Sequence, residues 1–375
     1  MDRTTVQNEA DDSARAEMQA GVDNMLFNCM GAQGGDSLVI VCEPDNDDYY
    51  STTLAQAVAG SVRKRELNVE IIGVPFLEDA SDFPNHVRLA METADHTLFL
   101  ARIGDQVRFA KLAGAGTKTM CYALDEASFA SPFCSADYRF FLELKHLINS
   151  ALWGNKEITI TCPAGTHLVG TSPADPGDDE TGDVMLRRFP MTVFRPVPGN
   201  TFSGRMAISK WLCSTGSLFY QPDSVLLDSV VIAHVVNGRI IDLEGNPGDV
   251  SKVRDHYEFV AEKYGLDKYI VHSWHAGFHP RNGYDGLALR NLLRWSGSAF
   301  GNPRYLHLHT CGNYAPGEIC VSVFDPTISV EAAKLWDDGK LVFAETAQVR
   351  ELFNRYPGID ELFTSPEREF GLDDT

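Results

Sequence analysis

The chain has 375 residues, of which 44% are hydrophobic and 10% aromatic, so it holds enough apolar material for more than one packed core. Its formal net charge is −20, from 52 acidic and 32 basic side chains, which argues against nucleic acid or an anionic membrane surface as a partner. No apolar run approaches the roughly 20 residues that a membrane-spanning helix needs.

The first 35 residues predict a helical extension that ends at Gly31, Gly34 and Gly35. Its first twelve residues are polar and acidic, unlike a secretory signal peptide. The eight cysteines include no CxxC pair, and several lie in apolar, strand-like runs, which is typical of buried, reduced thiols. These features favour a cytoplasmic protein.

Strand-like and helix-like segments alternate over residues 36–152. Apolar, β-branched runs predict four strands, at residues 37–42, 69–74, 95–100 and 117–123. Helical periodicity is found at residues 51–66, 87–93 and 136–152. This alternation predicts an α/β domain with a doubly wound, Rossmann-like parallel sheet. No GxGxxG fingerprint follows the first strand, so a dinucleotide site is not expected.

The pattern changes after Trp153, and a mixed α+β domain is predicted over residues 153–349. Alternating polar and apolar residues predict strands at 157–162 and 166–171. Two apolar runs, 224–236 and 238–243, meet at Asn237-Gly238, which predicts a hairpin. A charged helix is predicted over residues 247–264. Residues 350–375 are expected to form a short helix and an acidic tail.

Five of the eleven histidines fall within 38 residues, and they suggest where chemistry takes place. His272, His275 and His279 lie in the segment HSWHAGFHP, and His307 and His309 lie in YLHLHTCGNY. The last two alternate in an apolar strand, so they are expected to point to one face. Glycine and proline in the first segment argue against a helix, so its histidines would project from a strand end or a loop.

Neutral imidazole is the commonest transition-metal ligand, and two histidines with one carboxylate are typical of non-haem Fe(II) sites. The five histidines and the nearby carboxylates Asp285, Glu318 and Asp325 can supply such a set, although their spacing does not specify which of them bind. Fe(II) is the expected ion, with zinc or manganese as alternatives. The same histidines also suit a polar pocket that binds no metal.

Other side chains near the cluster suggest supporting roles. Glu318 could accept a proton from the far ring nitrogen of a ligating histidine. Trp274 and Tyr314 could flank a flat substrate. Cys311 is either an activated thiolate or, as is more common, a buried thiol.

Several landmarks occur in a familiar order between Ser37 and Pro326. They are the strand 95–100 (DHTLFL), the hairpin 156–168 (KEITITCPAGTHL), Phe189-Pro190 followed by 196–204, GFHP at 277–280, HTCGN at 309–313 and VFD at 323–325. In this order they resemble the superfamily of aminopeptidase T-type metallopeptidases and 2,5-dihydroxypyridine 5,6-dioxygenase. The last of them resembles that superfamily's HxD motif.

The resemblance implies a metal enzyme, but with an altered ligand set. The peptidase glutamate would fall near Thr192, so a dinuclear aminopeptidase is not expected. The histidine of HxD would fall on Val323, which leaves Asp325. A dioxygenase-type triad would keep Asp325 with His275 or His272, and would need His307 or His309 to complete it. With the resemblance, the predicted metal ligands are therefore His275, His309 and Asp325. The histidines expected to replace a ligand or to act beside the metal are His272, His279 and His307.

Two functions remain open. The first is a mononuclear, Fe(II)-dependent, dioxygenase-like enzyme that acts on a small aromatic or amide substrate. The second is a non-catalytic protein that binds a peptide or small molecule in a natural-product pathway of the crocagin type, with a degenerate site and no metal. In both cases we expect a homodimer formed through the second domain, because Trp211, Phe219, Tyr220 and the hairpin at Asn237 offer apolar surface.

Overall fold

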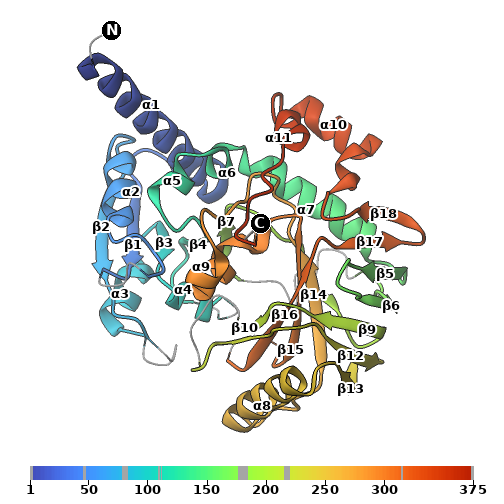
Figure 1. Ribbon diagram of the computed structural model, residues 1–375. Coiled ribbons are helices and arrows are strands. Elements are labelled where there is room, and N and C mark those ends of the chain that lie inside the picture. The colour runs from blue at the N-terminus through green and yellow to red at the C-terminus, as the bar shows by residue number, and fades with distance from the viewer. Residues whose placement is uncertain are drawn as a thin grey trace. The chain divides into compact units, whose positions relative to one another are not determined.

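The computed structural model describes residues 3–44, 48–77, 83–108, 110, 112–175, 185–214, 220–313 and 316–372 (Figure 1). The chain divides into two compact units. The first comprises residues 1–141 and 184–191, and the second comprises residues 142–183 and 192–375. Within these described ranges, no helix combines the length and the apolar character that a membrane span requires.

The first unit contains a five-stranded parallel sheet in the order β2-β1-β3-β4-β7. Its strands are β1 (Ser37–Cys42), β2 (Asn68–Gly73), β3 (His96–Leu100), β4 (Thr117–Cys121) and β7 (Arg187–Phe189). Since β2 and β3 flank β1 on opposite sides, right-handed crossovers place α2 (Leu54–Arg63) and α3 (Asn85–Thr93) on opposite faces. The predicted doubly wound parallel sheet is therefore confirmed.

Burial along these strands follows their place in the sheet. Every residue of β3 is buried and only the two ends of β1 are partly exposed, as expected for central strands covered on both faces. The edge strand β2 is partly exposed along its length. The apolar, β-branched residues of β1 and the run Leu98, Phe99 and Leu100 in β3 suit these strands to the centre.

Helices complete the first unit and lead into the second. The chain begins with α1 (Arg3–Asp23) and the π-helical η1 (Asn24–Met30), which ends at Gly31 with a φ of 75°. Buried Asn24 joins this extension to its unit, since its Nδ2 donates to the carbonyls of Cys134 and Ala136 at 2.7 Å. The other helices are α4 (Ile103–Gln106), α5 (Glu126–Phe129), α6 (Pro132–Ser135) and α7 (Tyr138–Leu152).

The second unit contains a seven-stranded antiparallel sheet in the order β13-β12-β9-β6-β5-β17-β18. Its strands are β5 (Glu157–Thr161), β6 (His167–Thr171), β9 (Ser203–Ile208), β12 (Val231–Val236), β13 (Arg239–Glu244), β17 (Thr327–Val330) and β18 (Ala333–Trp336). The predicted hairpin is β12–β13. Asn237 and Gly238 at its turn both have positive φ, 47° and 69°, as a two-residue type I′ turn requires.

A six-stranded antiparallel sheet, in the order β11-β10-β16-β15-β14-β8, carries the histidines. Its strands are β8 (Val197–Pro198), β10 (Trp211–Cys213), β11 (Ser224–Leu226), β14 (Val271–Ala276), β15 (Tyr305–Cys311) and β16 (Glu318–Phe324). The apolar run 224–236 is thus not one strand, because its first part pairs in this sheet and its last part in the other. Figure 1 shows β14, β15 and β16 side by side.

The helices of the second unit are short apart from α8 (Pro247–Tyr264), which has the predicted bounds. Asn246 caps its start by accepting from the Gly248 N–H, and Gly265, with a φ of 66°, ends it. The others are α9 (Leu292–Ser298), α10 (Ala347–Arg355), α11 (Asp360–Thr364), η3 (Ala288–Arg290), η4 (Ala299–Gly301) and η5 (Val342–Glu345). The C-terminal segment therefore forms two short helices.

Two of the aromatic residues expected at a dimer interface are instead buried within the chain. Trp211 packs edge-on against Trp295, with ring centroids 5.1 Å apart. The Tyr220 hydroxyl donates to the backbone carbonyl of Glu318 at 2.8 Å. Phe219 lies outside the described residues. The apolar surface that motivated a dimer is therefore smaller than expected, and the dimer itself stays a prediction.

A candidate metal site formed by three histidines

Strand pairing in the six-stranded sheet gathers polar side chains on one face. Residues directly opposite each other in an antiparallel pair share a face. His275 on β14 lies opposite His307 on β15, and Ser273 lies opposite His309. Because positions two apart on a strand also share a face, all four side chains point the same way.

The three histidines are close enough to bind one ion. A ring nitrogen of each lies within 4.8 Å of a ring nitrogen of the other two. The ring centroids of His275 and His307 are 4.0 Å apart, and both lie 4.8–4.9 Å from that of His309. The side chains are buried, with exposed fractions of 6%, 6% and 8%. Across the described part of the chain, this is the one group of three or more such side chains with that spacing.

Hydrogen bonding determines which nitrogen of His275 is available to a metal. Its Nδ1 lies 3.3 Å from the carbonyl oxygen of Phe194, which can only accept. The ring proton therefore belongs on Nδ1, and Nε2 keeps its lone pair. That atom faces Nε2 of His307 at 2.5 Å. This is the arrangement in which the far nitrogen of a ligating histidine is held by a carbonyl.

His309 is held from both sides. Its Nε2 lies 3.3 Å from Oε1 of Glu318, and its Nδ1 lies 2.9 Å from Oγ of Ser273. A carboxylate only accepts, so Nε2 donates to Glu318 and Nδ1 keeps the lone pair that accepts from Ser273. The expected contact between Glu318 and a histidine of the cluster is thus present. In this tautomer the ring nitrogen of His309 that carries a lone pair is Nδ1.

The donor set fits a divalent transition metal. Ligands about 2.0–2.1 Å from a tetrahedral ion lie roughly 3.3 Å from one another, within the spread of nitrogen separations found here. The buried carboxylate of Glu318 would offset part of the ion's charge, which three neutral imidazoles leave uncompensated.

An aromatic layer lies next to the histidines on the same face. The Tyr305 ring stacks on His307 with centroids 5.4 Å apart and planes 24° apart. Trp295 from α9 packs on Tyr305 at 5.1 Å, and Phe300 meets His307 edge-on at 6.3 Å. The cluster therefore has apolar walls, as a site that excludes water needs.

Asp325 does not join the histidines. On β16, Ser322 lies opposite His307, whereas Val323 lies opposite Leu306 and so points to the other face. Asp325 follows the strand with a φ of 49°. Its carboxylate accepts from Nε and Nη2 of Arg304 at 2.6 and 2.9 Å. The aspartate of the HxD-like segment is thus part of an ion pair, and His307 takes the place beside His275 and His309.

The remaining histidines also lie outside this group of three. His272 is one position out of phase with its neighbours in β14, and its Nε2 lies 2.8 Å from the carbonyl oxygen of Cys311. His279 follows the strand and is fully buried, and burial lowers its pKa to about 3. Its backbone N–H donates to the carbonyl of Gly301 at 3.0 Å. Neither is among the three histidines that converge, and their roles beside a metal stay predictions.

Cys311, Trp274 and Tyr314 were also expected near the site. Burial raises the pKa of Cys311 to about 11, so this side chain is a thiol and not an activated thiolate. Trp274 points to the opposite face and packs between Phe194 and Phe202, with ring centroids 5.8 and 5.9 Å away, so it cannot flank a substrate at the histidines. Tyr314 lies outside the described residues.

Ser273 is a site residue that the sequence reasoning missed. Its position two residues before His275 in an apolar strand was the available signal, because alternation places both on one face. Its contact with His309 depends on the register between β14 and β15, which includes an irregularity between Val271 and Ser273. Local sequence contains no sign of that irregularity.

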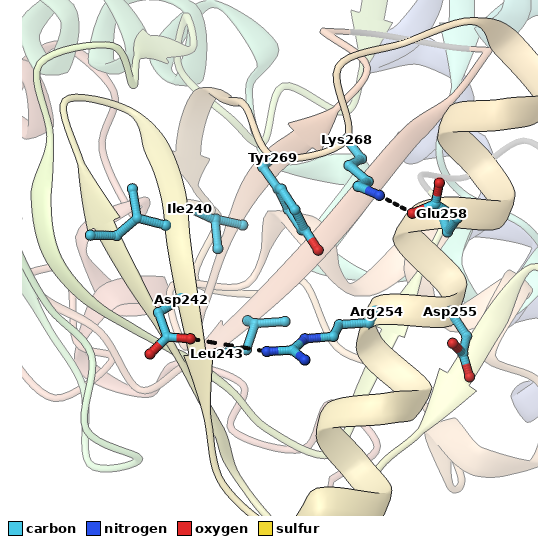
Figure 2. A pocket seen from close by; sticks show the side chains of 9 residues that line it. Ile240, Asp242, Leu243, Arg254, Asp255, Glu258, Lys268 and Tyr269 are labelled. Carbon is cyan, nitrogen blue, oxygen red and sulfur yellow. Dashed lines mark hydrogen bonds and ion pairs between the residues drawn. The ribbon is translucent and has the colours of Figure 1, made fainter.

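A surface groove of about 370 Å³ also lies in the second unit, between β13, α8 and Lys268–Tyr269 (Figure 2). Two ion pairs join charged side chains of its lining. Arg254 Nη2 lies 4.0 Å from Asp242 Oδ1, and Lys268 pairs with Glu258. The groove is lined by no histidine or cysteine, and the group of three side chains spaced to hold a metal ion lies elsewhere, at His275, His307 and His309.

Comparison with known proteins supports the fold. No family model matches the chain, and no curated protein matches its sequence. Among solved structures, 2,5-dihydroxypyridine dioxygenase from Pseudomonas putida KT2440 aligns with a TM-score of 0.58 and 11% identity, over 90% of this chain and 99% of that one. The two proteins share a fold. This agrees with the resemblance of the landmark segments. AmpT from Thermus thermophilus aligns with a TM-score of 0.46 and 10% identity, over 88% and 99% of the respective chains.

Proposed function

We propose that the protein is a metal-dependent enzyme whose single divalent ion is held by His275, His307 and His309. The convergence of three buried imidazoles, one of them backed by Glu318, carries this proposal. Three protein ligands leave coordination positions open for a substrate, as catalytic sites require. The tautomers that the hydrogen bonds favour leave a lone pair on Nε2 of His275 and on Nδ1 of His309, and these lone pairs would bind the ion.

We further propose dioxygenase-like chemistry with Fe(II) on a small aromatic or amide substrate. The fold shared with a dioxygenase of a dihydroxylated pyridine supports this class. The aromatic side chains of Tyr305 and Phe300 beside His307 suit a flat substrate. A bound iron ion would supply the redox chemistry that activation of dioxygen needs. The chain's own residues would exclude water and hold the ligand rings.

A metal-dependent hydrolase is the second candidate, and the all-imidazole ligand set favours it. Three histidines with one open position are the ligand set of a well-known class of catalytic zinc sites. Such an ion would supply a water molecule that is deprotonated near neutral pH. In that case dioxygen would not be consumed, and zinc would support activity better than iron.

Metal analysis of the purified protein tests the proposal. Protein prepared without oxygen is titrated with Fe(II), Zn²⁺ and Mn²⁺, and bound metal is measured after gel filtration. We expect one ion per chain, strong loss in His307→Ala, and no loss in the matched control His272→Ala. Oxygen uptake with a panel of dihydroxylated aromatic compounds then separates the iron enzyme from the zinc hydrolase.

If the wild-type protein retains none of the three metals, the enzyme proposal fails. The alternative is then a protein that binds a small molecule or peptide without catalysis. The direct contact of 2.5 Å between the Nε2 atoms of His275 and His307 is the observation in its favour, because two imidazoles can share a proton without an ion between them.

A further inference from the structure

A thiol and a phenol touch beside the three histidines. The hydroxyl of Tyr305 lies 3.2 Å from Sγ of Cys320, and both residues are 2% exposed. The same hydroxyl lies 3.1 Å from Oγ of Ser322. The ring is held on one face by His307 and contacted by Trp295. Thiol and ring are therefore kept together in a fixed orientation.

Both partners of this contact adjoin proposed metal ligands. Tyr305 stacks on His307, and Cys320 lies directly opposite His309 in the pairing of β15 with β16. We propose that Tyr305 and Cys320 become joined by a thioether bond, between the sulfur and the ring carbon next to the hydroxyl-bearing carbon. The bond forms when a redox-active metal occupies the three-histidine site, so this inference rests on the proposed function.

The step is a two-electron oxidation with dioxygen as the oxidant. The S–H bond of Cys320 and one ring C–H bond of Tyr305 break, and one S–C bond forms. The two hydrogens leave as two protons and two electrons, which dioxygen takes up to become hydrogen peroxide. The hydroxyl directs the reaction to the neighbouring carbon, and the sulfur lies 3.2 Å from that hydroxyl. Burial keeps external thiols away from both groups.

The product would hold β15 and β16 together beside the site. A covalent bond at Tyr305 would fix the ring that supports His307 and would keep the hydroxyl near Ser322. Rigid support of a ligand ring is what a metal site needs from its surroundings. The metal bound at the three histidines would thus promote a modification that makes its own site more rigid.

A competing reaction must be separated from this one. Cys213 on β10 lies directly opposite Cys320 and is also buried. A disulfide between them would remove two hydrogens as well, so total mass cannot distinguish the two products. A thioether resists dithiothreitol and a disulfide does not. The variant Cys213→Ser also removes the disulfide while it leaves the contact between Tyr305 and Cys320.

The test is peptide mass spectrometry on iron-loaded protein exposed to air. Samples are reduced with dithiothreitol, alkylated, and cut with trypsin and a glutamate-specific protease. Cleavage at Glu318 separates residues 305–318, which hold Tyr305, from residues 319–331, which hold Cys320. We expect the two peptides to remain joined. Their mass should be two hydrogens below the sum of the peptide with alkylated Cys311 and the peptide with unalkylated Cys320. Tyr305→Phe and Cys320→Ser should abolish the joined peptide, and Cys213→Ser should retain it.

Metal content, measured on the same samples, separates the two proposals. If protein with a full complement of iron contains no joined peptides after repeated exposure to air, the cross-link proposal is wrong. The metal-site proposal would still stand. A joined species that dithiothreitol separates, or that Cys213→Ser removes, would show a disulfide instead. Zinc-loaded protein should remain unlinked. Protein that binds none of Fe(II), Zn²⁺ and Mn²⁺ refutes both proposals. Protein that binds zinc but no redox metal refutes the cross-link and leaves the metal site standing, and the metal assay distinguishes these outcomes directly.

Discussion

The Oε1 atom of Glu318 lies 3.3 Å from Nε2 of His309, between neighbouring strands of the six-stranded sheet. Because Ser273 occupies the other ring nitrogen at 2.9 Å, the imidazole has one orientation in which both nitrogens are satisfied. The carboxylate thereby acts on the proposed metal through a histidine and does not contact it. Removing the charge should therefore weaken metal binding while the three ligands stay in place.

Glu318→Gln is the variant that tests this relationship. An amide cannot match the carboxylate as an acceptor for the Nε2 proton, and loss of such a partner typically costs roughly 10- to 100-fold in metal affinity. We expect that range for the dissociation constant of Co²⁺ or Zn²⁺, measured by competition with a chelating dye. Glu331→Gln, at an exposed turn, is the matched control and should bind metal like the wild type. Equal affinity in all three proteins would remove Glu318 from the site.

Ser273→Ala distinguishes which nitrogen of His309 binds metal. The Ser273 hydroxyl must leave Nδ1 before that atom can bind an ion, and a hydrogen bond contributes about 0.5–1.5 kcal/mol. We therefore expect metal to bind the variant more tightly, by a factor of about 2 to 10. Weaker binding would point to Nε2 as the ligand atom. The same competition assay reads out either result.

Asp325→Asn separates stability from metal binding. The Arg304–Asp325 pair is bidentate and largely shielded, with side chains 13% and 22% exposed. We expect a loss of about 1–3 kcal/mol in the free energy of unfolding, measured with urea, because a charge-assisted pair is broken. The metal dissociation constant should not change. A loss of affinity like that of His307→Ala would restore Asp325 as a ligand.

Buried histidines should make the protein less stable in mild acid. Burial lowers the pKa of His279 to about 3 and that of His256 to about 4, against an ordinary value near 6.5. Below pH 6.5 the unfolded chain takes up these protons and the folded chain does not, so stability is present above that pH and is lost as the pH falls. Between pH 7.5 and 5.0 we expect each to cost about 2 kcal/mol.

Urea unfolding at pH 7.5 and pH 5.0 measures this loss in the free energy of unfolding. The loss should be smaller in the variant His279→Asn than in the wild type. The remaining difference in that variant comes from His256 together with the other groups that titrate between these pH values. The carboxylate of Asp249, whose pKa is lowered chiefly by its hydrogen bond from Ser229, titrates in a lower pH range and does not enter this window. An identical loss in the variant and the wild type would show that His279 is protonated in the folded state.

Local patterns determined the elements of this protein. The run of β-branched residues at 37–42, the turn at Asn237-Gly238 and the capped helix 247–264 each contain their own signal, because strand, turn and helix preferences depend on neighbours within a few residues. The strand–helix alternation predicted the parallel sheet for the same reason. The histidines were candidates from their residue type alone.

Which of those candidates meet was decided only by the pairing of distant strands. His275 and His307 are 32 positions apart and become neighbours through the register of β14 with β15. On β16, the pairing with β15 directs Ser322 toward the histidines and Val323 away from them. Asp325 lies beyond the end of this strand and forms an ion pair with Arg304. Side chains alternate along a strand with a period of two, so a shift of one residue moves a side chain to the other face of the sheet. The spacing of residues along the chain does not reveal that shift.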